Sequence, residues 1–155
     1  MTLRLNLGSG EDRREGYTHV DLRPDCADVL GDVRALPFGE NSADHILALD
    51  ILEHLPPSAS LSTLRHWHDI LEPGGRLTLR VPNLFQLARF IVEGYMVEAA
   101  IINIMGGHRW GPEGAWDCHH ANWTPVLLGE LLAAAGFEVL SNDLDLNMTV
   151  EARKR

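Results

Sequence analysis

The chain has 155 residues, of which 45% are hydrophobic and 23% are charged, a composition that fits one folded domain and excludes a disordered or fibrous protein. Thirteen lysines and arginines against 22 aspartates and glutamates give a net charge of −9. Proteins that track nucleic-acid phosphates usually carry the opposite balance, so we expect no nucleic-acid partner. Two cysteines make no disulfide framework and favour a cytoplasmic location. We therefore expect a single domain over residues 1–155.

The first part of the chain predicts three short strands. Leucines alternate with polar residues over Leu3–Leu7, Thr18–Leu22 stops before a proline, and Asp28–Gly31 is short and weakly patterned. Parallel neighbours in a sheet normally need a crossover of a dozen or more residues. These connections are shorter, so we expect the helices of the first half to be shortened or missing.

Strand and helix signals alternate through the rest of the chain. In order, they predict a buried strand at Asp44–Leu49, a helix at Ser58–Leu71 ended by Pro73-Gly74-Gly75, a strand at Gly75–Val81, a helix at Val126–Ala135 capped by Thr124-Pro125 and stopped by Gly136, and closing strands at Phe137–Ser141 and Asn147–Ala152. The alternation predicts an α/β fold, a Rossmann-like and mostly parallel sheet with a closing antiparallel strand.

The most apolar long stretch is Leu84–Met105, which charged and amide side chains interrupt. It is therefore not expected to span a membrane, and the N-terminus has no signal-peptide pattern. The stretch fits a long core helix and a substrate-covering element about equally well, and residues 84–123 are the candidate lid.

Two features follow the first two strands directly. Gly8-Ser9-Gly10 offers backbone amides to an anionic or polar ligand, although a plain tight turn contains the same pattern. Asp21 can accept both hydroxyls of a ribose, or it can form an Asx turn before Pro24. Asp21 follows the glycines too closely for the dinucleotide-binding pattern, and Arg13 stands in place of its third glycine, which argues against a nicotinamide dehydrogenase.

Successive segments then resemble one family. LNLGSG, HVDL, GDVRALPFGENSADHILALDILEHL and LEPGGRLTLRVPN are similar, in this order, to the motifs of class I S-adenosylmethionine-dependent methyltransferases, especially small members found near sugar and polysaccharide genes. The resemblance covers Leu3–Asn83 and continues more loosely through Gly136–Asp143. It implies S-adenosylmethionine as cofactor and direct methyl transfer to a small-molecule or sugar-type acceptor.

The resemblance also implies roles for single residues. Gly8 and Gly10 would face the methionine part of the cofactor, with Asp50 beside it. Asp21 would hold the ribose hydroxyls. The adenine contacts would be the Asp32 carboxylate and the Val33 amide, and the expected cofactor set is completed by Asn6, Ser9 and Leu22. Asn6 stands where the family usually has an acid, so we expect a weaker attraction for the ammonium group of the cofactor.

The segment Gly106–Pro125 is rich in glycine, tryptophan and histidine, the composition of a functional loop. His119 is the first candidate for a proton acceptor, because D-x-H-x-x-x-W-T resembles a run in the same small methyltransferases. Asp117 and His108 come next. His54, in the EHL motif, favours a structural role.

Adjacent histidines within Asp117–His120 lack the usual spacing of a structural zinc site, so we expect no metal. Two rival functions stay open. One is a protein that binds the cofactor without catalysing, and the other is a metal-dependent hydrolase built on Asp117–His120.

The missing helices also predict an interface. Val20, Leu22 and Val29 are expected to leave apolar surface open on one side of the sheet, because parallel sheets are normally covered on both faces. Either Leu84–Met105 folds back over that surface or a second copy of the chain does. The apolar residues on more than one face of Leu84–Met105 favour a homodimer.

Overall fold

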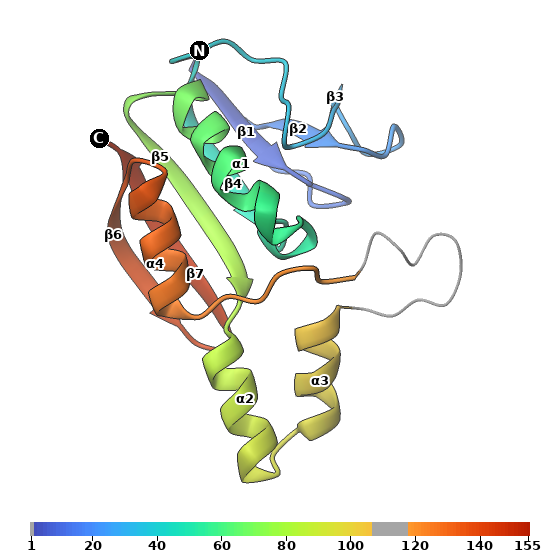
Figure 1. Cartoon of the computed structure of the whole chain (residues 1–155). Coiled ribbons are helices and arrows are strands. Elements are labelled where there is room, and N and C mark those ends of the chain that lie inside the picture. The colour runs from blue at the N-terminus through green and yellow to red at the C-terminus, as the bar shows by residue number, and fades with distance from the viewer. Residues whose placement is uncertain (1, 107–117) are drawn as a thin grey trace.

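The computed structural model describes residues 2–106 and 118–155, which build a seven-stranded sheet with the order β3-β2-β1-β4-β5-β7-β6 (Figure 1). The strands are β1 (Leu3–Leu7), β2 (Thr18–Asp21), β3 (Val29–Leu30), β4 (Ala43–Leu49), β5 (Leu71–Pro82), β6 (Phe137–Leu144) and β7 (Asn147–Lys154). β7 runs antiparallel to β5 and β6, and the other neighbours are parallel. The predicted Rossmann-like sheet with a closing antiparallel strand is confirmed.

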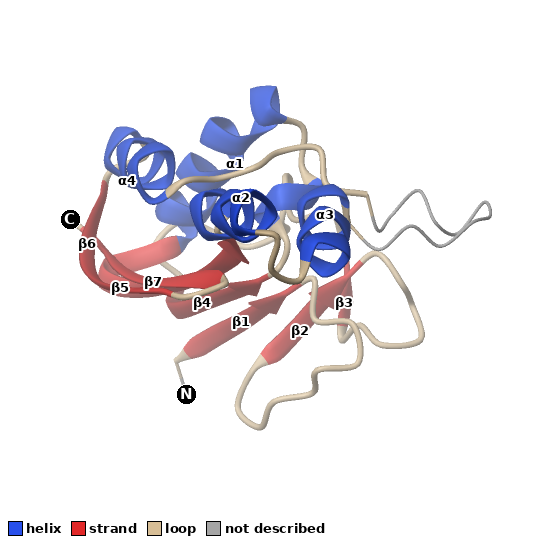
Figure 2. Ribbon diagram, turned by 90° about the horizontal axis from the view of Figure 1, so that it is seen from below, coloured by secondary structure: helices blue, strands red, loops and turns tan. Residues whose placement is uncertain are grey.

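The helices described lie on one side of this sheet (Figure 2). They are the 3-10 helix η1 (Leu52–His54) and the α-helices α1 (Pro57–Ile70), α2 (Leu84–Glu93), α3 (Val97–Met105) and α4 (Pro125–Ala134). As predicted, the Thr124 side chain caps α4 by accepting from the Leu127 amide at 3.3 Å, and Gly136 follows it with a positive φ. No helix within residues 2–106 and 118–155 combines the length and the apolar character that crossing a membrane requires.

The hydrophobic core lies between the sheet and α1 and α4. Alternate side chains of the central strands are fully buried, among them Leu5, Ile46 and Leu77. On α1, Trp67 is also fully buried, and its indole Nε1 donates to the Val33 carbonyl at 2.8 Å. This bond fastens α1 to the loop that follows β3, and so positions that loop at the carboxyl edge of the sheet.

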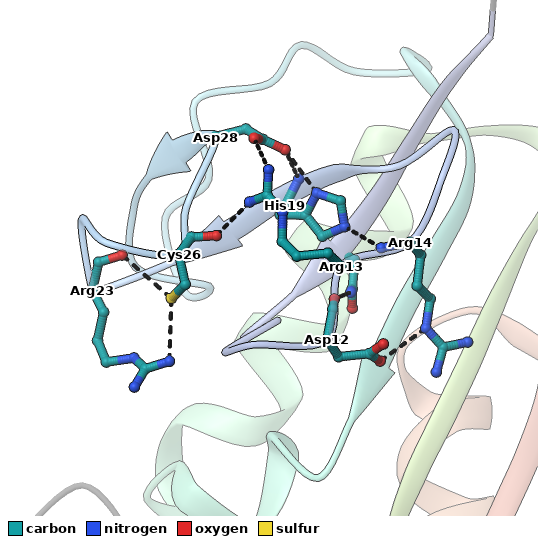
Figure 3. Close-up of polar contacts among 8 residues, drawn as sticks. Asp12, Arg13, Arg14, His19, Arg23, Cys26 and Asp28 are labelled. Carbon is teal, nitrogen blue, oxygen red and sulfur yellow. Dashed lines mark hydrogen bonds and ion pairs between the residues drawn. The ribbon is translucent and has the colours of Figure 1, made fainter.

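A polar network stands where a first covering helix would begin (Figure 3). The buried ring of His19 bonds Asp28 through Nδ1 at 2.7 Å and accepts from the Arg14 amide through Nε2 at 2.8 Å. The Arg13 guanidinium donates to Asp28 and to the Cys26 carbonyl, both at 2.6 Å. The His19 amide and ring, with Arg13, hold the pKa of Asp28 well below its usual range. Side-chain bonds therefore order the β1–β2 connection without a helix.

A second polar chain crosses the sheet face away from the helices. Arg4 donates to the Tyr17 hydroxyl, which lies 2.6 Å from Nδ1 of His45. His45 Nε2 lies 2.9 Å from the Thr78 hydroxyl, which donates to Glu151 at 2.7 Å. Because Thr78 uses its one proton on Glu151, His45 donates from Nε2 and accepts at Nδ1. The hydrogen-bonded series of side chains therefore connects the cation of Arg4 to the anion of Glu151 through a neutral His45.

These hydrogen-bonded side chains make the stability of the fold depend on pH. Burial and the nearby Arg4 lower the pKa of His45 below its ordinary value of 6.5. Folding therefore disfavours the protonated ring, and stability that is present above about pH 6.5 is lost as the pH falls below it. Urea unfolding at pH 7.5 and pH 5.5 should show a larger loss for the wild type than for His45→Gln. Equal losses would contradict this assignment.

Two expectations about the open face are wrong. Val20 is fully buried and Val29 packs against the core, because the loop that carries Leu36 and Phe38 joins the same core; of the three residues named, only Leu22 is largely exposed. Leu84–Met105 is also not one long helix, and it does not fold back over the open face (Figure 2).

The break in Leu84–Met105 lies between α2 and α3. Gly94 takes the left-handed conformation that ends α2, and Met96 also has a positive φ. The two helices pack mainly on each other and extend beyond the carboxyl ends of the strands (Figure 1). Their exposed apolar side chains are Phe85, Val92, Tyr95, Met96, Ile101, Ile102 and Met105.

Candidate functional site

The turn after β1 has no room for a side chain at Gly8. A Cβ atom there would lie 1.8 Å from Cδ1 of Ile51, and its φ of +59° also favours glycine. The amides of Gly8 and Ser9 both donate to the Val20 carbonyl, at 2.8 and 3.3 Å. The Ser9 hydroxyl is buried and has no hydrogen-bond partner among the residues described. The turn is therefore closely packed, and it holds one buried polar group without a partner among the residues described.

Asp21 organises this turn from the end of β2. Its carboxylate accepts from the Gly10 amide through Oδ2 at 2.8 Å and from the Arg23 amide through Oδ1 at 2.9 Å. A carboxylate oxygen has two lone pairs, and each therefore keeps capacity for a further donor. Leu22 follows with 51% of its surface exposed, at the same edge of the sheet.

Asp32 and Val33 follow β3. The Arg34 guanidinium bonds both carboxylate oxygens of Asp32, with a shortest distance of 2.6 Å, and this lowers the pKa of Asp32. The bond from Trp67 to the Val33 carbonyl holds the adjacent peptide in place. A cation thus stands beside the carboxylate that was predicted to contact an adenine, a neighbour that sequence reasoning missed.

Asp50 ends β4 in a left-handed conformation, with φ of +56°. Arg80 of the neighbouring strand β5 forms a two-pronged ion pair with it, with Nε 2.9 Å from one carboxylate oxygen. The buried Asn6 amide donates to the Asp12 carbonyl at 2.9 Å and so supports the turn after β1. Arg80 was missed because its partner lies on another strand, whose register the sequence does not reveal.

Glu53 is the most unusual residue of the site. Its side chain is fully buried in η1, and neither carboxylate oxygen has a hydrogen-bond partner on another residue within residues 2–106 and 118–155. Burial, reinforced by the charge of Asp50, raises the pKa of Glu53 to about 8. The signal in the sequence that could have indicated a buried acid is the position of Glu53 among the apolar residues of ILEHL.

The backbone of Glu53 anchors the segment that returns from the candidate lid. The Glu53 carbonyl accepts from the amides of His120 and Ala121, at 2.8 and 3.0 Å. This places the His119 ring against His54, edge to face, with their centroids 4.8 Å apart. One ligand atom from each of Glu53, His54 and His119 lies within 4.8 Å of the others.

Most of the predicted cofactor residues lie at the carboxyl ends of the strands, and His119 lies in the segment that returns to η1. The turn at Gly8–Gly10 follows β1, Asp21 ends β2, Asp32 follows β3, and Asp50 follows β4. The second and third choices for a proton acceptor, His108 and Asp117, lie outside the described residues. The edge therefore combines a glycine turn, three carboxylates and an imidazole pair, a set suited to hold a polar ligand and to accept a proton.

Comparison with known proteins agrees with this arrangement. A family model described as a methyltransferase domain matches residues 11–142. No curated protein matches the chain. Among solved structures, an S-adenosylmethionine-dependent methyltransferase from Methanosarcina mazei is 17% identical, with a TM-score of 0.69, 97% of this chain covered and 91% of that one.

Two further structures share the fold. A 1,6-didemethyltoxoflavin-N1-methyltransferase from Burkholderia thailandensis, with bound S-adenosylhomocysteine, is 22% identical at a TM-score of 0.66, over 99% of this chain and 72% of that one. A [4+2]-cyclase is 18% identical at a TM-score of 0.62, over 99% and 74%. At these identities the likeness concerns the fold alone.

Proposed function

The chain belongs to the methyltransferase-domain family, and we propose that it transfers a methyl group from S-adenosylmethionine to a small-molecule or sugar-type acceptor. The observation that carries the proposal is the buried Ser9 hydroxyl, which has no partner among the described residues and sits in a turn bonded to Asp21 through Gly10. An unpaired buried hydroxyl costs free energy that a bound polar ligand would recover. The residues at this edge thus fit the cofactor that the family uses.

We assign the cofactor contacts by their place at the strand ends. The glycine turn and Asp50 would hold the methionine part, Asp21 would accept from the ribose hydroxyls, and Asp32 with the Val33 amide would meet the adenine. Asn6 would support the glycine turn from within β1, and Leu22 would lie beside Asp21. Arg80 pairs with Asp50 and so limits the negative charge that the methionine part would meet.

The bound cofactor supplies a methyl group on a sulfonium, which needs no covalent intermediate on the protein. The chain's own contribution would be to align the acceptor and exclude water, effects that reach about 7–11 kcal/mol at best. His119 would take the proton of the acceptor, since its backbone is held over η1 by the bonds from residues 120 and 121 to Glu53. Residues 84–123, the candidate lid, would cover the bound acceptor.

A panel of sugars, amines and phenols, assayed for release of S-adenosylhomocysteine, tests the proposal. We expect turnover above the rate without acceptor for one class of compound. Binding of S-adenosylmethionine without turnover on any of them would instead support a cofactor-binding protein that does not catalyse.

We also propose that each chain folds as one domain and that two chains form a homodimer in the cytoplasm. The exposed apolar side chains of α2 and α3 support it, because large apolar patches usually mark interfaces. Sedimentation equilibrium at micromolar concentration should give twice the monomer mass, and Val92→Glu, at an 87% exposed position, should shift it toward the monomer. A wild-type monomer would contradict the dimer.

A further inference from the structure

The geometry of η1 and the returning segment 118–121 points to a site that the sequence did not suggest: we propose that Glu53, His54 and His119 bind a transition-metal ion of the Zn²⁺ type. These residues come from two parts of the chain that are far apart in sequence. The metal binding that we considered from sequence concerned Asp117–His120, a set that shares only His119 with this cluster.

The first argument is the buried carboxylate. Glu53 is fully buried, and no other residue in the part of the chain that the structure describes donates a hydrogen bond to its oxygens. Arg80, a cation whose charge acts on Glu53, is already engaged by Asp50. A buried carboxylate needs a proton or a cation, and an ion held between Glu53 and the two rings would meet that need.

The second argument is the orientation of His54. Its Nδ1 lies 3.2 Å from the Cys118 carbonyl, which can only accept, so in the neutral ring Nδ1 carries the proton and Nε2 carries the lone pair. A ring nitrogen that donates to a backbone carbonyl while the other faces the ion is the usual support for a histidine ligand. The anchoring of residues 120 and 121 on the Glu53 carbonyl holds His119 on the same side.

The third argument is the donor set and its spacing. Two imidazole nitrogens and one carboxylate form the ligand set of open zinc sites, with a position left for water or substrate. The three candidate ligand atoms lie within 4.8 Å of one another, and two ligands of a tetrahedral zinc ion with bonds of about 2.0–2.1 Å lie roughly 3.4 Å apart. Metal binding would therefore require side-chain rotations that draw the three ligand atoms closer together. Magnesium prefers all-oxygen sites and is not expected here.

Occupation of this site has one consequence for the reaction. His119 would give the metal the lone pair that proton acceptance requires, so the metal-bound form would be inhibited. This consequence rests on the proposed function, whereas metal binding itself does not.

The test is a titration of Zn²⁺ into the metal-free wild-type chain, without S-adenosylmethionine, against a chelating indicator. We expect one site per chain, an at least tenfold loss of affinity in Glu53→Gln and in His119→Gln, and no change in His120→Ala, which removes the exposed neighbouring ring. Mg²⁺ should not compete at the same concentration.

Circular dichroism checks that each variant is folded, and His119→Gln carries the test if Glu53→Gln is not. The proposal is overturned if the wild type has no such site, if neither folded cluster variant weakens it, or if His120→Ala weakens it equally. The last result would assign zinc to the sequence run 117–120 in place of the proposed cluster. Because no cofactor is present in this titration, zinc binding by a chain that transfers no methyl group in its metal-free form would refute the proposed function alone.

Discussion

Replacing His119 with alanine is expected to lower the turnover number by about 10²–10⁴, the usual contribution of a positioned proton acceptor, with S-adenosylmethionine affinity nearly unchanged. The ring lies against His54 over η1, and the predicted ribose and adenine contacts follow β2 and β3, so its loss should not disturb them. Single-turnover kinetics and calorimetry on the metal-free variant measure the two quantities.

The matched control for this prediction is His120→Ala. His120 is the adjacent histidine, its side chain is exposed, and its backbone makes the bond to Glu53 that the substitution keeps. We expect it to retain turnover. A His119→Ala variant that loses cofactor affinity and turnover to the same extent would show that His119 acts as a structural residue.

Asp21→Ala is expected to weaken the binding of S-adenosylmethionine by at least tenfold. The substitution removes the proposed bonds to the ribose, each charge-assisted and worth about 1.5–3 kcal/mol, and it also frees the Gly10 amide, which Asp21 now holds at 2.8 Å. The first effect removes contacts with the ligand and the second loosens the turn, so both weaken binding. Isothermal titration calorimetry measures the change.

Asp25→Ala controls for the loss of one negative charge nearby, because Asp25 is exposed in the turn that follows β2. It should bind S-adenosylmethionine as the wild type does. If Asp21→Ala also binds with the affinity of the wild type, the ribose assignment is wrong.

Local signals were sufficient for most elements of the fold. These signals act over a few residues, and they include the alternating leucines of β1, the Thr124 cap of α4 and the short connections before β4. The structure contains each of these features at the predicted position. The helix break at Gly94 was missed because apolar periodicity continues on both sides of it, and a single glycine inside a helical pattern does not by itself end a helix.

Contacts between distant segments were beyond sequence reasoning. The hydrogen-bonded series of side chains from Tyr17 through His45 to Glu151 depends on the register of β1, β4, β5 and β7. These polar contacts explain why the open face of the sheet needs no covering helix there. The cluster at Glu53 likewise depends on where residues 118–121 return to η1. Residue types in the strand-end motifs could be recognised, but their partners could not.

The most direct test of the central claim is a calorimetric titration of S-adenosylhomocysteine into the wild-type chain. This ligand keeps the adenine, ribose and amino acid parts that the loops after β1 to β4 are proposed to hold. We predict saturable binding at one site per chain. A folded chain that shows no saturable binding would contradict the account.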